Sequence, residues 1–437
     1  MKKYLGQWLI AGGLITLCSP LYALDLVETY QLARQQDALL QIAQSQLEAE
    51  RQALPLAQSG NKPQVNLTAS ATLSDANNEL TGDDELAVLG YGISLQQNLY
   101  NTGISAQIDV AEATVRQAEA DYRVVDQDLI VRVTEAYFGI LSAQDTVDFA
   151  IAEKNAIGRQ LEQAKKRFEV GLIAITDVKE AQASYDASLA QEIIARNALD
   201  NARQTLQVII GQAVPRDLSV LGEQVDLTIP EPADRQAWVE QARKNNFSLV
   251  SAEAALQAAS EARNIAQADG DPTLAFIASY NGNTIDSHNN GGYDTGDLAV
   301  SLQFNMPLYT GGRTGATIAK AEADYNTARD NLLLQNRLVS QAANTAYLAV
   351  LAGISQVNAL QQALVSTNAA LEATEAGFDV GTRTSVDVLI SLRATYGARR
   401  DYSSARYDYL INTLKLRQAA GLLSEEDLTA INRWLTP

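Results

Sequence analysis

The side chains that most often carry out chemistry in proteins are scarce in this sequence. His288 is its only histidine and Cys18 its only cysteine. Zinc sites and nucleophilic triads need several such groups in one place, and this sequence has almost none of the residues that either would require. His288 stands in a loop rich in Gly and Asn, where we expect a solvated side chain. No nucleophile, base and oxyanion donor can be combined, so the sequence predicts no enzyme, no metal site and no cofactor.

The charge and composition exclude a second class of protein. Lys and Arg number 33 against 52 Asp and Glu, which gives a net charge of -19. Nucleic-acid binders depend on basic side chains that neutralise phosphates, so we expect no nucleic-acid partner. The 437 residues could bury two or three cores, but aromatic residues make up only 6% and the mean hydropathy is -0.12. This composition favours long helices with polar faces over large globular cores.

Residues 1–23 have the three-part layout of a secretory signal peptide. Two lysines precede an apolar stretch from Leu5 to Leu17, and we expect cleavage after Ala23. Cys18 invites lipidation, but Leu17 is bulky where such sites need a small residue. No later segment approaches 18 consecutive apolar residues. If the exported chain spans a membrane, it therefore does so with strands.

The rest of the chain is an internal duplication with a period of about 209 residues. The matches include Ala33-Arg34 with Ala242-Arg243, Ala136-Tyr137 with Ala346-Tyr347, and Asp177-Val178 with Asp387-Val388. We therefore predict two repeats of one architecture, residues 24–232 and 233–437, joined through a proline-bearing stretch. Each repeat reads as a helix, two strands, a very long helix, a turn and a shorter helix.

The strands are predicted from strict alternation of apolar and polar residues. They cover about residues 64–75, 86–100, 273–282 and 297–309, with polar, acidic loops at 75–85 and 281–297. One interpretation is two half-buried hairpins of a soluble sheet. Isolated hairpins are marginal, however, and each strand is long enough to cross an outer membrane at a tilt. Four strands cannot close a barrel, so two chains would give eight strands and three would give twelve, and only the larger ring leaves an open lumen.

The helices predict a long tube. Clear breakers are absent between Gly103 and Gly171 and between Gly312 and Gly381, so each long helix has about 68 residues and a length on the order of 100 Å. The flanking helices, 25–60 and 177–212, are about half as long. Two of them laid end to end match one long helix, which places the linker near mid-height.

Two motifs at the ends of the long helices resemble the paired helix-turn motifs of the TolC family of outer-membrane efflux proteins. They are Phe168-x-Val170-Gly171-Leu172-Ile173-Ala174-Ile175-Thr176-Asp177-Val178 and Phe378-x-Val380-Gly381-Thr382-Arg383-Thr384-x-x-Asp387-Val388-Leu389. The resemblance implies a mostly α-helical homotrimer in which a twelve-stranded β-barrel in outer-membrane lipid continues into a twelve-helix tunnel across the periplasm. It also implies an exit duct for tripartite multidrug efflux and type I secretion, with a periplasmic adaptor and an inner-membrane transporter as partners.

The resemblance further implies a gate at the helix-turn tips. By position, Asp387 matches a carboxylate ring at the constriction, and Thr176 and Asp177 match the partners of Arg383 in the closed state. Such a ring favours cations, and loss of bidentate arginine pairs would free a helix pair to swing. The tips that receive the adaptor would be Val170, Gly171, Leu172, Val380, Gly381 and Thr382.

Alternatives remain at these positions. Asp177, with Glu180 three residues on, also fits a helix-capping arrangement, and Asp387 could be a plain N-cap. Relatives carry tyrosine at the position of Phe378 and aspartate at that of Ile390, which implies a single charged ring and a looser latch. The alternative function is a trimeric structural or adhesive surface protein without transport, although a sustained heptad repeat is not evident.

Overall fold

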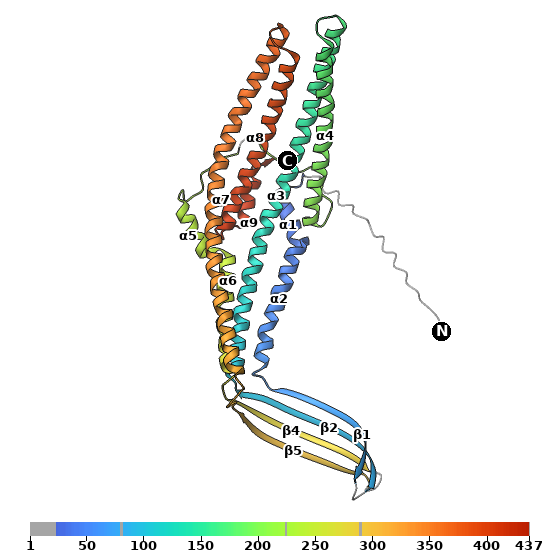
Figure 1. The fold of residues 1–437 in the computed structure, drawn as a ribbon, viewed down its shortest axis with the longest axis vertical. Coiled ribbons are helices and arrows are strands. Elements are labelled where there is room, and N and C mark those ends of the chain that lie inside the picture. Colours follow the sequence, from blue (N-terminus) through green and yellow to red (C-terminus); the bar gives the residue numbers. More distant parts are fainter. Residues whose placement is uncertain (1–22, 79–81, 223–224, 288–290, 437) are drawn as a thin grey trace, which may run out of the picture.

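The computed structural model describes residues 23–78, 82–222, 225–287 and 291–436. Residues 1–22 of the predicted signal peptide, including Cys18, lie outside this description, and so does His288. The described chain forms a slender rod of helices with a four-stranded antiparallel sheet at one end (Figure 1). The C-terminus lies near mid-height of the rod, beside the start of the first helix.

The first half of the chain contains four helices and two long strands. In order these are α1 (Leu26–Gln36), α2 (Ala38–Ser59), β1 (Gln64–Asn78), β2 (Gly82–Tyr100), α3 (Thr102–Glu169) and α4 (Ile175–Ile210). The second half repeats them as α5 (Arg235–Asn245), α6 (Phe247–Ala268), β4 (Thr273–Ser287), β5 (Tyr293–Asn305), α7 (Arg313–Asp379) and α8 (Ser385–Ala419). Helices α1 and α5 both have 11 residues, α2 and α6 both have 22, and α3 and α7 have 68 and 67. The predicted duplication is therefore confirmed.

Three short elements complete the chain near mid-height. They are β3 (Val220–Leu221), α9 (Glu425–Asn432) and β6 (Leu435–Thr436). Strand β6 pairs with β3, and the Asn432 amide donates a 2.9 Å hydrogen bond to Asp25. The C-terminal segment thus ties the two halves together at the level where α1 begins and α4 ends (Figure 1).

The predicted first helix, residues 25–60, is wrong as a continuous element because it breaks at Asp37. Asp37 has an extended backbone, with φ -64° and ψ 118°, and its carboxylate accepts a 2.8 Å bond from the Leu40 amide. Two guanidinium nitrogens of Arg132 in α3 donate hydrogen bonds to the same carboxylate, at 2.9 and 3.0 Å. Asn246 makes the corresponding break between α5 and α6. A new N-cap, held from a neighbouring helix, therefore starts α2.

The strands differ from the prediction at their ends. All four strands run further into the acidic loops than predicted, because main-chain pairing continues where the alternation of side chains stops. At its other end β5 is shorter than predicted, since it stops at Asn305 rather than near 309. Pro307, which has no amide hydrogen to donate, and the left-handed glycines Gly311 and Gly312 follow it.

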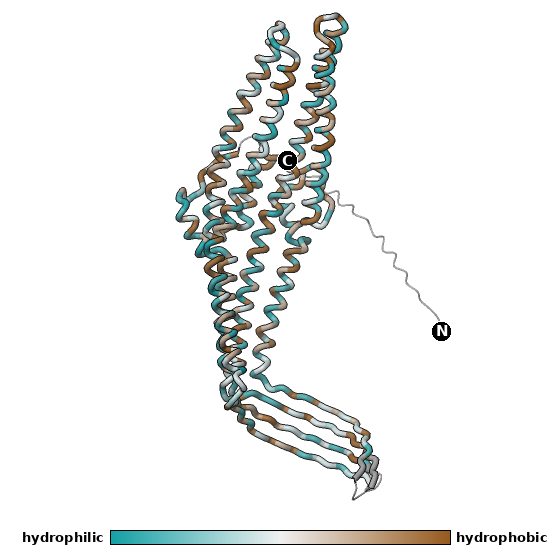
Figure 2. The backbone as a smooth tube through the Cα atoms, viewed as in Figure 1, coloured by the Kyte–Doolittle hydropathy of each residue, from teal (hydrophilic) through white to brown (hydrophobic). Residues whose placement is uncertain are grey.

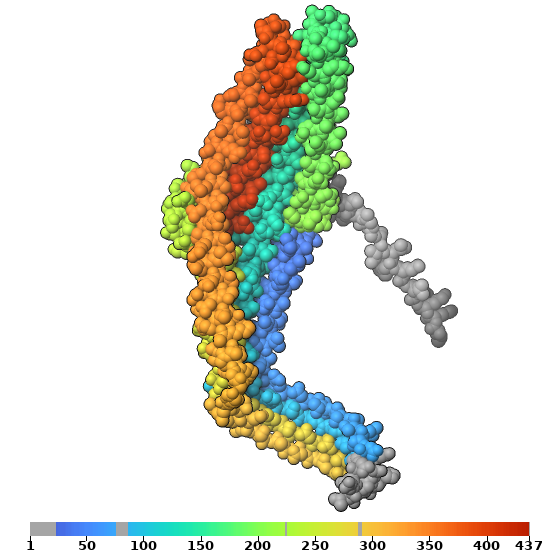
Figure 3. All heavy atoms as spheres, in the orientation of Figure 1, coloured from blue at the N-terminus to red at the C-terminus, as the bar shows by residue number. Residues whose placement is uncertain are grey.

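The helices form one curved layer in which α3 and α7 run the whole height. Near the sheet, α2 packs on α3, α3 on α6 and α6 on α7. Beyond mid-height, α4 packs on α3, α3 on α8 and α8 on α7. Above and below mid-height the layer therefore has four helices in a row, with α7 along one long edge and α2 or α4 along the other (Figure 3). Stacked shorter helices beside two full-length ones agree with the expected tube wall.

Large buried side chains gather mainly at mid-height. Phe138 stacks on Tyr407 with ring centroids 5.4 Å apart, and the Tyr137 hydroxyl lies 2.8 Å from the Ser219 carbonyl oxygen. Elsewhere the contacts between helices rely on small residues such as Ala113 and Ala181, which are nearly inaccessible. This distribution explains how a chain with few aromatic residues builds so long a structure.

Candidate functional site

The two hairpins α3–α4 and α7–α8 end in turns of the same design, at the end of the rod far from the sheet (Figure 1). Gly171 has φ +76° and Gly381 has φ +79°, and open space surrounds both. Left-handed backbone, rather than lack of room, therefore requires glycine there. In each turn the glycine amide bonds back to the carbonyl three residues earlier, at 2.9 Å to Phe168 and 3.1 Å to Phe378.

The six predicted docking residues lie at these two turns and are exposed. Val170, Leu172 and Val380 expose 70%, 73% and 76% of their surface. Exposed apolar side chains of this size, grouped on two neighbouring turns, mark a surface suited to contact with another protein.

Asp387 is the third residue of α8 and takes part in a capping box. Its carboxylate accepts 2.9 Å bonds from the main-chain N–H and the hydroxyl of Thr384, and its own N–H donates to that hydroxyl at 3.2 Å. The prediction of a plain N-cap is therefore wrong by position, since Thr384 is the N-cap. The Thr384 amide, then its hydroxyl, and the charge of Arg383 hold the pKa of Asp387 below its usual value. The carboxylate is thus charged and oriented.

Asp177 occupies the same position in the first repeat without a capping box. The N-cap of α4 is Ala174, which makes no side-chain bond, so the interpretation of Asp177 as a cap paired with Glu180 is wrong by position. Asp177 still stands in the first helical turn, where a carboxylate interacts favourably with the helix dipole. Its carboxylate is therefore available to a group outside its own turn.

The predicted latch residues are not brought together within one chain. Thr176 and Asp177 begin α4, whereas Arg383 follows α7, and the described residues contain no ion pair between Arg383 and Asp177. The stem of Arg383 instead covers Gly377, where an added Cβ would lie 2.8 Å from the arginine Cγ.

Sequence reasoning missed a contact that does join the two hairpins of one chain. The Arg167 guanidinium lies 4.2 Å from the ring centroid of Phe378 and 3.8 Å from a carboxylate oxygen of Asp379. Phe378 is only 8% exposed, so its ring is fixed beneath the arginine. Arg167 gave no signal in the sequence because a basic residue in the last turn of a helix is ordinary on its own.

A buried apolar cluster supports this contact. Ile157 and Leu161 of α3 are buried with Leu389 and Leu392 of α8. Further from the tip, Glu153 of α3 lies 4.0 Å from Arg393 of α8. The two hairpins of one chain are therefore joined along their length, with the Arg167 contact nearest the tip.

The two edges of the helix layer carry unburied apolar side chains. On α4, Ile193, Ile194 and Val208 are 62%, 60% and 80% exposed. The other edge helix, α7, is the one helix of the described chain that is long and apolar enough to cross a membrane, with an 18-residue mean hydropathy of 1.4, yet only 17% of that stretch is buried. Both edges therefore lack the neighbours that their composition calls for.

The sheet has the same incompleteness. Its order is β1-β2-β4-β5, so β1 and β5 are both free edges. Apolar and polar residues alternate along the strands (Figure 2). The apolar side chains therefore lie on one face, where Leu67 and Leu73 of β1 are 79% and 87% exposed and Phe304 of β5 is 66% exposed. A sheet with a large bare apolar face and two long open edges is an aggregation hazard unless lipid and further strands cover it.

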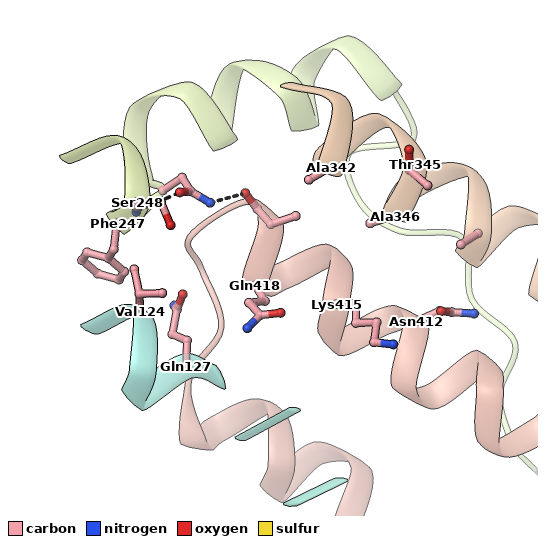
Figure 4. Close-up of a pocket in the computed structure, with 13 residues that line it drawn as sticks. Val124, Gln127, Phe247, Ser248, Ala342, Thr345, Ala346, Asn412, Lys415 and Gln418 are labelled. Carbon is pink, nitrogen blue, oxygen red and sulfur yellow. Dashed lines mark hydrogen bonds between the residues drawn. The ribbon is translucent and has the colours of Figure 1, made fainter. Parts of the chain in front are cut away.

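One hollow away from the tips carries little charge. An open hollow of about 440 Å³ lies between α3, α7, α8 and the α5–α6 junction, with Phe247 and Ser248 on one side and Gln418 on another (Figure 4). Its one charged lining residue, Lys415, lies 2.6 Å from Glu135. Within the described ranges, no three His, Cys, Asp or Glu side chains are grouped to hold a metal.

Comparison with known proteins identifies relatives along almost the whole chain. A family model described as "Outer membrane efflux protein" matches residues 29–212 and 238–422, one match in each repeat. The outer membrane protein TolC of Vibrio cholerae serotype O1 is 39% identical, over 100% of this chain and 99% of its own. TolC of Escherichia coli K12 is 34% identical, over 100% and 90%. The alkaline protease secretion protein AprF of Pseudomonas aeruginosa is 30% identical, over 98% and 91%.

Solved structures share the fold. The outer membrane protein VceC from Vibrio cholerae superposes with a TM-score of 0.75 at 19% identity, covering 91% of this chain and 96% of that one. CusC superposes with a TM-score of 0.76 at 17% identity, covering 91% and 92%. At these identities the likeness establishes the architecture of the chain and nothing about its cargo.

Proposed function

The chain belongs to the outer membrane efflux protein family, and from this premise we propose that three copies form one export duct. Each chain supplies four strands and, above and below mid-height, four helices. Three copies therefore make a twelve-stranded barrel continuous with a twelve-helix tunnel. Two copies would make eight strands, a barrel that its own side chains fill. The observation that carries the proposal is that both the sheet and the helix layer have open edges at the same two sides.

The sheet has the dimensions of an outer-membrane wall. The apolar side chains of β1 run from Val65 to Leu73, nine residues that span roughly 30 Å. This length suits the hydrocarbon of a bilayer. The apolar face would contact lipid, and the opposite face would line the lumen. The helix α3, with 68 residues, extends the duct by about 100 Å into the periplasm.

The duct would serve tripartite multidrug efflux and type I secretion. Relatives named for protease secretion and for cobalt, zinc and cadmium resistance support both kinds of export. We propose a periplasmic adaptor and an inner-membrane transporter as partners. The adaptor would contact the exposed turns around Gly171 and Gly381, where main chain and apolar side chains are both accessible.

The tips would form the gate, and the order of the helices supports a latch between copies. When the layer closes, α7 of one copy becomes the neighbour of α4 of the next. Arg383, which follows α7, then lies on the side of Thr176 and Asp177, which begin α4. Three Asp387 carboxylates would ring the constriction. Arg167 would hold the two hairpins of each chain together while the latch is closed.

Planar-bilayer recording of the purified trimer tests the duct and its gate. We expect Asp387→Ala to increase single-channel current and to weaken block by multivalent cations. Arg383→Ala should raise the fraction of time the channel is open. Glu180→Ala, which removes an exposed carboxylate one turn into α4, is the control and should change neither property.

Each part of the proposal can fail separately. Unchanged block in Asp387→Ala would remove the carboxylate ring, and wild-type opening in Arg383→Ala would remove the latch. A detergent-extracted trimer that conducts no ions would contradict the duct itself and would favour the alternative of a structural or adhesive surface protein.

A further inference from the structure

The face of the sheet opposite the apolar one is almost free of charge. The pairing register places residues in rows across the four strands, and one row reads Thr68, Gly92, Asn281 and Asp297. Neighbouring rows on this face carry Ser, Thr, Asn, Gln, Gly and a few apolar residues. Among the strand residues whose side chains the structure describes, Asp297 is the one charged group on this face.

The side chains of this row lie on one face of the sheet. An added Cβ at Gly92 would lie 2.5 Å from the amide oxygen of Asn281 and 3.1 Å from the Thr68 hydroxyl, so both neighbours lean over the glycine. Asn281 is paired with Asp297, and paired residues point to the same face. Asp297, at the end of the row on β5, is exposed.

Asp294, three residues earlier on β5, lies on the other face. An odd spacing along a strand reverses the face, and Asp294 shares its side with Leu298, Val300 and Leu302. The acidic residues described on that apolar face, Asp75, Asp286 and Asp294, all stand near the hairpin ends of their strands. Asp294 and Asp297 therefore form a matched pair of carboxylates, one on each side of the wall.

We propose that Asp297 makes the lumen of the β-barrel prefer cations, as a determinant of ion selectivity separate from the tips. This proposal rests on the proposed duct, since it needs the polar face to line a water-filled lumen. Three copies would then place three Asp297 carboxylates on the inner wall at one level. Rings of carboxylates are a general means by which pores favour cations.

The lumen is narrow enough for these charges to act across it. Twelve strands spaced about 4.8 Å apart and tilted about 40° enclose a barrel about 24 Å across between backbones. The carboxylates then lie within roughly 10 Å of the axis, which is about one Debye length at 0.1 M salt. Screened Coulomb attraction by three such charges enriches cations about twofold at the axis. At 1 M salt, where the Debye length is about 3 Å, the enrichment should vanish.

The test is the reversal potential across a bilayer that separates two KCl concentrations near 0.1 M. We expect Asp297→Asn to lower the permeability ratio of potassium to chloride at least about twofold, with no effect in 1 M KCl. Asp294→Asn removes the same charge from the same strand and should leave the ratio at its wild-type value. A ratio that is unchanged in Asp297→Asn, or lowered only in Asp294→Asn, overturns the proposal while the duct stands.

A cysteine variant gives a second readout. Cys18, the only cysteine in the sequence, lies in the predicted signal peptide, so Asp297→Cys introduces a single thiol into the exported chain. Cationic and anionic methanethiosulfonate reagents should shift the ratio in opposite directions. No shift with either reagent overturns the proposal. A purified trimer that forms no pores at all would instead overturn the proposed duct and, with it, the inference.

Discussion

Removal of the Arg167 side chain should make the closed tip easier to open. Arg167 lies 4.2 Å from the Phe378 ring centroid, and an arginine over an aromatic ring at a partly exposed site contributes about 0.5–1 kcal/mol. The ion pair with Asp379 adds little, because its atoms are 3.8 Å apart and the aspartate side chain is 71% exposed. Arg167→Ala should therefore destabilise the closed tip by about 0.7 kcal/mol in each chain.

This energy sets the expected change in channel opening. About 0.7 kcal/mol corresponds to roughly threefold in an equilibrium constant, if each chain opens independently. If the three chains open together, the energies add to about 2 kcal/mol and the factor becomes roughly thirtyfold. Open probability in planar bilayers measures this factor. The size of the change therefore also reports whether the tips open singly or together.

Companion variants identify which part of the contact matters. Arg167→Lys keeps a charge opposite Asp379 but loses the planar stack, so we expect it to fall between wild type and Arg167→Ala. Lys154→Gln is the control, because Lys154 pairs with Glu192 at 2.6 Å within one hairpin and does not join the two. The reasoning is refuted if intact Arg167→Ala trimers open no more often than Lys154→Gln trimers.

Three further predictions concern stability and insertion. Gly211→Ala should lower the free energy of unfolding by about 1–2 kcal/mol, because alanine is strained in the left-handed backbone conformation. Gly421→Ala should lower it at least about twice as much, because its Cβ would also lie 2.2 Å from a main-chain carbonyl oxygen. Melting of the trimer compares the two variants, and equal losses of stability would contradict the clash. Burial alone would raise the pKa of Asp37, but hydrogen bonds from an arginine and from main-chain amides lower it below its usual 3.8. The ionised carboxylate therefore stabilises the fold above pH 3.8, and this stabilisation is lost as the pH falls through the lowered pKa. The melting temperature of Asp37→Asn should accordingly lie below wild type at pH 7 and approach it below about pH 4, and a gap that does not depend on pH would count against this account. Leu67→Arg should destabilise the inserted protein by about 2–4 kcal/mol per chain if this position faces lipid, and should therefore reduce the amount of folded protein in outer membranes. Thr68→Arg, on the opposite face, should be tolerated. Equal yields of the two variants would argue against the assigned faces.

The regular features of the fold could be predicted from the sequence because they repeat. Alternating side chains identified the strands, and the absence of proline identified α3 and α7 as single long helices. The break at Asp37 could not be predicted in the same way. Its surroundings favour helix on both sides, and Arg132, which grips its carboxylate, lies 95 residues away. The pairing of β3 with β6 likewise depends on contacts between distant parts of the chain.

In the candidate site, too, residues in local motifs could be predicted and residues that depend on distant contacts could not. The glycine turns and Asp387 could be located from a local motif, because a left-handed glycine and a capping carboxylate are properties of a few adjacent residues. Arg167 could not, since its partners Phe378 and Asp379 lie on the other repeat. The proposed role of Asp297 could not be predicted either, because it depends on the strand register, which decides the face of the sheet on which the side chain lies.

The free edges of β1 and β5 also have a consequence for inheritance. In the proposed ring, each chain would pair one edge strand with each of two neighbours, so a copy with a damaged edge would disrupt a ring even when the other copies are intact. When half of the chains in a cell carry such damage, only about one eighth of randomly mixed rings of three are wholly intact. An allele that blocks strand pairing at either edge would therefore be dominant over the wild-type allele. The surviving fraction would count the subunits, since rings of two would leave about one quarter intact.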